Sequence, residues 1–164
     1  MALAERRGPR PSTTATNPHT QLDQRPTAAM NDVLADALFA LPRVREQPSA
    51  ISVPGARALW LPPADARGPR EAFLIGREFA HLHPLPDGSL HAALPPSLVA
   101  EAIARGWAEI HPVARMGLIP GNVVMLYAPR DDAELAVVLG LVRAALAFAR
   151  GEFRKTGNNK RRKR

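Results

Sequence analysis

The chain has 164 residues, of which 46% are hydrophobic, so it can bury one core but is short for two ordinary domains. It contains no cysteine, which excludes disulfide bridges and thiolate metal sites and makes a cytoplasmic location the natural expectation. There is no run of about 18 apolar residues and no hydrophobic core of a signal peptide at the N-terminus, so we expect a soluble protein with no membrane partner.

The net charge of +7 is concentrated at the two ends of the chain. Residues 1–29 carry four basic and two acidic side chains, residues 151–164 carry seven basic and one acidic, and residues 30–150 have a net charge of −1. Residues 1–29 are poor in large apolar side chains, so we expect a disordered leader there and a disordered, solvated basic tail over 151–164. The tail could also bind nucleic acid weakly and without sequence preference, by releasing counterions.

The predicted domain, residues 30–150, begins with a helix and short strands. Asn31 is a suitable cap for a helix from about Asp32 to Ala40, which carries an apolar stripe. Short strands are expected at Ile51–Val53 and Arg57–Leu61, on either side of a proline and a glycine. Residues Glu71–Ile75 indicate the start of a further strand.

Two strands over Glu78–His83 and Ser89–Leu94 are predicted to form a hairpin. Between them, Pro86, Asp87 and Gly88 have the composition of a three-residue loop closed by a bulge. The loop length determines which residues lie opposite one another and which face of the sheet each side chain occupies.

The register predicted from this loop places three histidines on one face of the sheet. It pairs His83 with His91 and His81 with Ala93, and cross-strand partners share a face with residues two positions away. A two-residue loop would instead send His91 to the opposite face.

The second half of the domain predicts a helix, two strands and a last helix. The first helix starts at Pro95 and Pro96 and ends at Gly106, and the last is capped by Asp131 and ends before Gly151. The strands are expected at 107–111 and 123–127. Strands and helices come in blocks, so we predict an α+β fold: a small single domain with a mainly antiparallel sheet and three helices packed on it.

Four motifs, HLHP, DGSLHAALP, AIARGWAEIHP and VVMLYAPRDDAELAVVLGLVRAALAFA, resemble those of the luciferase-domain family over about residues Met30 to Gly151. Its characterised members include the fungal luciferases, and it has many uncharacterised bacterial members. The resemblance implies that a hydroxylated, hispidin-type pyrone reacts with molecular oxygen without a bound metal or flavin. The present chain is much shorter than those enzymes.

One interpretation of the histidine face, based mainly on this resemblance, is oxygenation without a cofactor. A histidine removes the proton of an enol, the other histidines orient the oxyanion, and the enolate reacts with molecular oxygen as co-substrate. The catalytic candidates are His81, His83, His91 and His111, and the substrate-binding candidates are Phe79, Trp107, Tyr127 and Arg130.

A second interpretation is a metal-dependent enzyme. In it, His81, His83 and His91 bind zinc or iron through neutral imidazoles and leave positions open for water, oxygen or substrate. Three acidic residues lie nearby in the sequence, but spacing alone does not assign any of them as the partner of a histidine: Glu78, Asp87 and Glu109.

The third interpretation is a non-catalytic domain that binds a small apolar or enolic molecule, or a protein partner, in a groove. Here the histidines are ordinary strand residues, Trp107 and Tyr127 are core residues, and Arg130 is a surface charge at a helix start. His19, in the expected leader, has no role in any interpretation. The apolar last helix must be covered by the sheet and the first helix or by a second subunit, which would make a homodimer.

Overall fold

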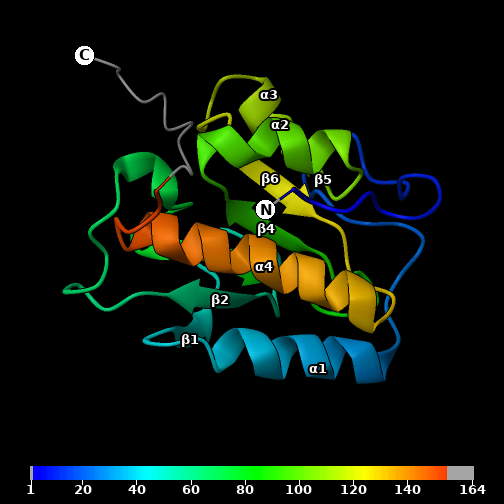
Figure 1. Ribbon diagram of the computed structural model, residues 1–164, viewed down its shortest axis with the longest axis horizontal. Helices are drawn as coiled ribbons and strands as arrows, with labels where there is room; N and C mark the ends of the chain where they lie inside the picture. The colour runs from blue at the N-terminus through cyan, green and yellow to red at the C-terminus, as the bar shows by residue number, and fades with distance from the viewer. Residues whose placement is uncertain (1, 155–164) are drawn as a thin grey trace, which may run out of the picture.

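An antiparallel sheet of six strands organises residues 2–154, the part of the chain that this computed structural model describes. The strands are β1 (Arg45–Pro48), β2 (Arg57–Trp60), β3 (Glu78–Leu82), β4 (Leu90–Ala93), β5 (Ala108–Ile110) and β6 (Val123–Leu126). Their spatial order is β1-β2-β3-β4-β6-β5. The helices are α1 (Ala28–Phe39), the 3-10 helix η1 (Arg70–Ala72), α2 (Pro96–Ala104), α3 (Pro112–Arg115) and α4 (Asp132–Ala149) (Figure 1). The predicted α+β class, with three longer helices packed on an antiparallel sheet, is confirmed.

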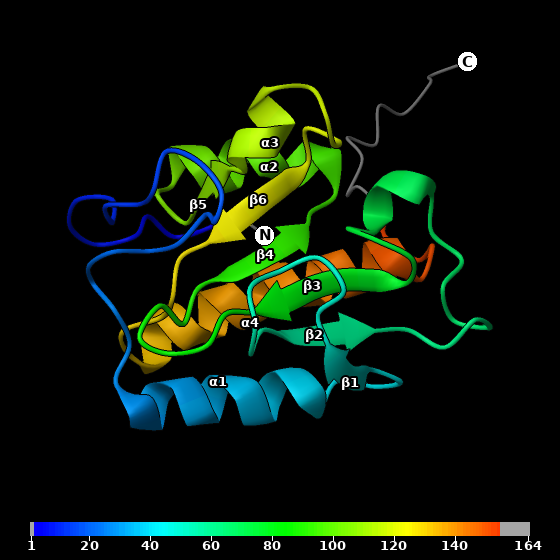
Figure 2. The ribbon, with the colours of Figure 1, turned by 180° about the vertical axis from the view of Figure 1, so that it is seen from behind.

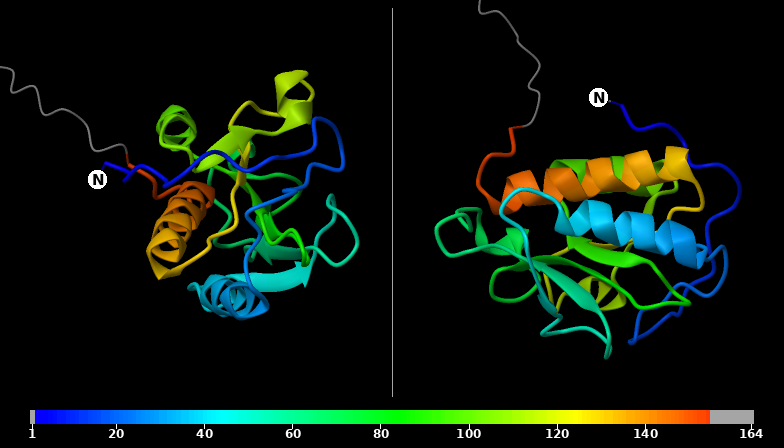
Figure 3. Two further views of the ribbon diagram at one scale, coloured as in Figure 1. Left: turned by 90° about the vertical axis from the view of Figure 1, so that its right-hand side faces the viewer. Right: turned by 90° about the horizontal axis from the view of Figure 1, so that it is seen from below.

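Helices α1, α2 and α4 lie on the same side of the sheet. Helix α4 packs against β3 and β4, and α1 lies beside it (Figures 1 and 3). The core fills the space between these layers and includes Leu38 of α1, Leu141 of α4 and Leu90 of β4, each at most 2% exposed. Burial of a side chain of this size contributes about 1.5–3 kcal/mol, so these contacts fix the sheet against its helices.

Helix α4 begins where the sequence predicts. The carboxylate of Asp131 accepts the backbone N–H of Glu134, and the carboxylate of Glu134 accepts the backbone N–H of Arg130. Val138 and Val142 face the core one turn apart and are fully buried. Among the residues that the structure describes, no helix is long and apolar enough to cross a membrane.

A bulge in β3 changes which side chains face the core. Ala80 pairs with Leu59, whereas Glu78 pairs with Trp60, so Phe79 is an extra residue in the ladder. Phe79 therefore packs in the core together with Ala80. Glu78 is turned to the opposite face of the sheet, where its carboxylate meets His81.

The hairpin between β3 and β4 has a longer loop than the sequence predicts. His81 pairs with His91, and the N–H of His83 donates to the carbonyl of Ser89, which leaves five loop residues, 84–88. The predicted three-residue loop and the pairing of His83 with His91 are therefore wrong. The predicted face is nevertheless correct, because both loops have an odd number of residues and the side chains alternate with a period of two.

Several local predictions are also wrong. Residues 51–53 form a bend instead of a strand. The strand before them is β1, which is exposed along its whole length and so has no alternating pattern. Helix α1 begins earlier than expected, capped by Thr27, whose hydroxyl accepts the N–H of Met30. The strand predicted at 107–111 is present as β5, but the short helix α3 that follows it was not predicted.

The N-terminal segment, residues 2–27, is ordered along the domain, in contrast to the disordered leader that its composition predicts (Figure 2). The N–H of Arg6 donates to the carbonyl of Arg105, and the indole N–H of Trp107 donates to the carbonyl of Ala4. The side chain of Gln21 is fully buried and accepts the N–H of Ala128 at 2.9 Å. Polar contacts hold this segment, together with the packing of Leu3 against the core. The predicted basic tail falls mostly on residues 155–164, outside the described part of the chain.

Replacing Gln21 with alanine tests this attachment. We expect Gln21→Ala to lower the free energy of unfolding by about 1–3 kcal/mol, because the buried N–H of Ala128 loses its acceptor. Urea denaturation followed by circular dichroism measures the change. Leu22→Ala, at a neighbouring side chain that is 46% exposed, is the control and should change stability little. Equal stability of Gln21→Ala and the wild type would contradict the packing of this segment.

Candidate active site

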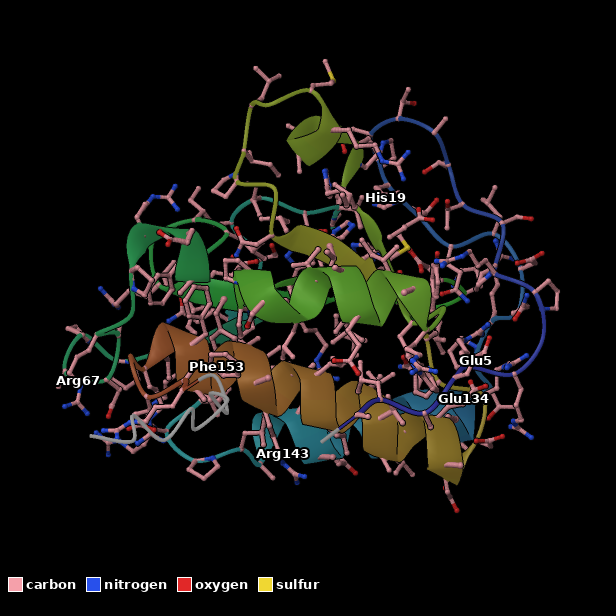
Figure 4. The ribbon with its side chains drawn as sticks, turned by 45° about the horizontal axis from the view of Figure 1, so that its top comes forward. Glu5, His19, Arg67, Glu134, Arg143 and Phe153 are labelled. Carbon is pink, nitrogen blue, oxygen red and sulfur yellow. The ribbon has the colours of Figure 1, made fainter. Side chains whose placement is uncertain are left out.

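All five histidines of the chain line one pocket of about 450 Å³ on the face of the sheet opposite the helices. His81 and His91 lie opposite each other on β3 and β4, and His83 follows the end of β3. His111 caps α3. The N-terminal segment contributes His19, which is labelled in Figure 4 and whose ring lies 5.2 Å from that of His111. The prediction that His81, His83 and His91 share a face is confirmed.

A continuous row of hydrogen-bonding contacts joins three of these rings and ends in a carboxylate on each side. Glu78 Oε1 lies 2.8 Å from His81 Nδ1, and His81 Nε2 lies 3.0 Å from His91 Nδ1. His91 Nε2 lies 3.0 Å from His19 Nδ1, and His19 Nε2 contacts Glu109 Oε1. The row crosses the sheet from β3 to β5 and depends on the N-terminal segment for its fourth member.

Hydrogen bonds hold both terminal carboxylates in place. Glu78 is fully buried and accepts the hydroxyl of Ser49 at 2.7 Å and the N–H of Ala50 at 3.1 Å. Glu109 accepts the hydroxyls of Thr13 at 2.6 Å and Tyr127 at 3.0 Å. Each carboxylate thus accepts two hydrogen bonds in addition to its contact with a histidine.

His83 has a carboxylate partner of its own. Its Nδ1 lies 2.8 Å from Asp87 Oδ2 and 3.1 Å from Ser89 Oγ. Asp87 is 7% exposed and also accepts the N–H of Ser89, so the loop that joins β3 to β4 fixes this pair. Each of the three acids that the sequence could not assign thus contacts a histidine ring nitrogen.

His111 is oriented differently. Its Nδ1 accepts the backbone N–H of Val113 at 3.1 Å, so in the neutral ring the proton lies on Nε2. Burial and the nearby imidazoles lower the pKa of His111 to about 4. His111 therefore stays neutral near pH 7 and can donate a hydrogen bond from Nε2.

Burial controls the charge of the other groups in the cluster. It lowers the pKa of His81 and lowers that of His91 well below the usual value, with the neighbouring imidazoles acting in the same direction. For Asp87 and Glu109, burial acts to raise the pKa, but hydrogen bonds from His83 and His19 outweigh it and leave each carboxyl pKa lowered. Burial and Glu109 raise the pKa of Tyr127 to about 12. Near pH 7 the rings of His81, His91 and His111 are therefore neutral, and the carboxylates of Asp87 and Glu109 are ionised.

The rest of the pocket wall is mostly apolar, with Asn17 and Ser52 as its polar members. Its apolar side chains are Pro18, Ile51, Val53, Leu74, Val113, Ile119 and Val123. The loop after β1 contributes Ile51 and Val53, and passes over β3 and β4 (Figure 2). No lysine or arginine lines the pocket among the described residues. Such a wall can bury an apolar group and offers no fixed cation for a phosphate group.

The four residues proposed to bind substrate lie outside this lining. Phe79 and Trp107 belong to the hydrophobic core. Tyr127 is also buried, with its hydroxyl on Glu109 behind the row of histidines. Arg130 forms an ion pair with Glu134 at the start of α4. Tyr127 thus contacts a group that orients a histidine, and the other three stabilise the fold.

His19 is the lining residue that sequence reasoning missed. It is 3% exposed and stacks on His91, with the two ring centroids 5.1 Å apart. The expectation that it lies in a disordered leader, away from the other histidines, is wrong. The sequence offered one weak signal for His19. The chain has only five histidines, four of them lie within residues 81–111, and His19 is the fifth.

Comparison with known proteins identifies the domain that carries this pocket. Residues 76–145 match a family model described as the luciferase domain. The chain is also 31% identical over 165 residues to a luciferase of Armillaria ostoyae, covering 89% of this chain and 60% of that protein. The chain therefore carries a luciferase domain. Over 75 residues it is 39% identical to luciferases of Armillaria gallica and Neonothopanus nambi, covering 44% of this chain and 28% of each of them. No solved structure matches significantly.

The segment that matches the luciferase domain contains only part of the pocket lining. Residues 76–145 contain four of the five histidines and all three acids that contact them. His19 and the apolar loop 51–53 lie before the matched segment and complete the wall. The chain spans less than two thirds of the length of the luciferases it matches.

Acid titration of the luciferase domain tests the neutral state of the cluster. The folded-state pKa of His111 lies below the value of 6.5 for an unfolded chain, so only the unfolded chain binds its proton between pH 6.5 and about 4. The free energy of unfolding should therefore fall as the pH decreases through this window. Urea denaturation at a series of pH values and constant ionic strength measures the slope.

The matched variant for this titration is His111→Asn. Asparagine can still cap α3 but does not titrate, so the slope should become shallower while stability near pH 7 changes little. Parallel curves for the two proteins would show that His111 takes up a proton equally well in both states, against its lowered pKa.

Proposed function

We propose that this protein oxygenates a small, electron-rich enolic molecule of the pyrone type within the histidine pocket. The main support is the composition of the pocket, which has five imidazoles at one end and a largely apolar wall elsewhere. The relatives that are named luciferases support an oxidative reaction in a domain of this kind. The polar end would hold the oxygen atoms of the substrate, and the apolar wall would hold its rings.

The reaction requires ionisation of the enol. Loss of the hydroxyl proton gives an enolate, which transfers one electron to molecular oxygen; the resulting radical pair combines to form a carbon–oxygen bond. Return of the proton gives a hydroperoxide, so the sum of the reaction is one substrate and one oxygen molecule. The buried imidazoles are neutral near pH 7 and can take part in this proton transfer. The apolar wall excludes water that would reprotonate the enolate.

In the metal-free protein, His83 is the imidazole best suited to act as the base. Its Nδ1 donates to Asp87, which leaves the lone pair on Nε2 available at the pocket. The carboxylate also stabilises the imidazolium that forms when His83 accepts a proton, in the arrangement that orients histidine bases in hydrolases. His81 and His91 are less available, because each uses both ring nitrogens in the row of contacts.

A binding domain without catalysis is the alternative function. It is favoured by the contacts that already engage most ring nitrogens of the cluster, because such contacts can serve stability alone. The two functions differ in one observable. A catalyst consumes oxygen when an enolic ligand is present, whereas a binding domain only retains the ligand.

Oxygen uptake in the presence of hydroxylated pyrones and related ketoenols tests the proposal. We expect uptake above the buffer rate with the full-length protein, and His83→Ala should lower it by about 10²-fold or more, the usual contribution of a general base. Val53→Trp should also lower uptake, by filling the apolar side of the pocket. An oxygen electrode measures the rates.

The control for both variants is Met116→Ala, at a side chain that is 69% exposed and outside the pocket lining. It should retain the full rate. Equilibrium dialysis against the same pyrones separates binding from reaction. Ligand binding without oxygen uptake across the panel would replace the oxygenase with the binding domain.

A further inference from the structure

The number of protons in the histidine row does not match the number of contacts. Four contacts join the carboxylates of Glu78 and Glu109 through His81, His91 and His19. Each contact requires one proton between its two atoms, but three neutral imidazoles carry only three protons. With both carboxylates ionised, one nitrogen–nitrogen contact has two lone pairs facing each other across 3.0 Å.

The carboxylates determine where this contact can be. Both accept hydrogen bonds, so the protons of His81 and His19 lie on the nitrogens that face Glu78 and Glu109. The proton of His91 then lies either on Nδ1, towards His81, or on Nε2, towards His19. In the first case the lone pairs of His91 and His19 face each other, and in the second those of His91 and His81 do.

A third lone pair is available at only one of these two positions. His83 donates from Nδ1 to Asp87, so its Nε2 has a free lone pair. Ligand nitrogens of His81, His83 and His91 all lie within 4.8 Å of one another. The other group of three is His19, His91 and His111, but the lone pair of His111 already accepts the N–H of Val113. The first group therefore offers three free lone pairs, and the second offers two.

We propose that His81, His83 and His91 bind a divalent transition-metal ion. Two imidazole nitrogens on one ion, each about 2.0–2.1 Å from it, lie about 3.0–3.4 Å apart, depending on the angle between them. The 3.0 Å between His81 Nε2 and His91 Nδ1 is within this range. An ion at this position removes the repulsion between the facing lone pairs of His81 and His91.

The surroundings of the three histidines suit such an ion. Glu78 and Asp87 hold the outer nitrogens of His81 and His83, as carboxylates do behind metal-binding histidines. Their two negative charges balance the two positive charges of the ion. His19 Nδ1 accepts a hydrogen bond from the protonated Nε2 of His91. The lone pair of His91 is then on Nδ1, which faces the site. Three neutral nitrogen ligands without a thiolate favour zinc or ferrous iron, and the pocket leaves room for a fourth ligand.

Metal titration of the full-length protein, purified without a polyhistidine tag and stripped by a chelator, tests this site. Zinc and cobalt titrations by calorimetry should show one ion per chain, and cobalt should give the absorption spectrum of a bound ion. A single binding event is expected because all five histidines line one pocket and the chain has no cysteine.

Variants identify the ligands. His83→Ala should abolish stoichiometric binding, and Asp87→Asn should weaken it by about 10–100-fold. His111→Asn is the matched control and should bind as tightly as the wild type, because the lone pair of His111 already accepts the N–H of Val113. Near-ultraviolet circular dichroism confirms that each variant is folded. Loss of binding in His111→Asn with retention in His83→Ala would overturn the assignment.

Nitrogen-15 shifts of the histidine rings in the stripped protein provide an independent measurement. They should show one unprotonated nitrogen on each of His81, His83 and His91. No metal uptake by the wild type, together with a doubly protonated ring in the row, would show that a shared proton occupies the gap and would overturn the proposal.

The metal site does not depend on the proposed oxygenation, and the two can fail separately. A bound ion would occupy the lone pair that His83 needs as a base, and would itself favour ionisation of the enol. If the metal-free protein takes up oxygen and the metal-bound protein does not, the ion has only a structural role. Metal binding without any uptake would leave the site in place and remove the oxygenase.

Discussion

The pairing of His81 with His91 across β3 and β4 is the constraint on which the rest of the site depends. It places two imidazoles directly opposite each other on the face of the sheet that the helices leave uncovered. Polar rings buried in this position require partners, and the surrounding segments supply them. The β3 bulge turns Glu78 towards His81, the hairpin loop brings Asp87 to His83, and β5 presents Glu109.

The two faces of the sheet thus differ in what they contribute to the protein. The face under α1 and α4 is apolar and stabilises the fold, while the opposite face carries an ionisable cluster held by hydrogen bonds. The N-terminal segment belongs to the second face, since His19 joins His91 to Glu109. Fold and site are therefore built from different residues of the same strands, alternating along β3 and β4.

Sequence patterns were sufficient for the elements that bury an apolar stripe. Helix α4 and the shared face of His81, His83 and His91 follow from periodicity and capping residues. Exposed β1 has no such period, and the order of the N-terminal segment depends on single contacts such as that of Gln21 with Ala128, which leave no pattern in composition. The partners of the histidines were equally hidden, because Glu78 reaches His81 only through a bulge at Phe79.

The hairpin between β3 and β4 tolerates only some shifts of register. A shift by two residues keeps every side chain on its face, because side chains alternate with a period of two, but it separates His81 from His91. A shift by one residue carries His91 into the apolar layer beneath α4 and brings Leu90 to the pocket. The row of histidines therefore forms only while the five-residue loop holds the two strands in this one register.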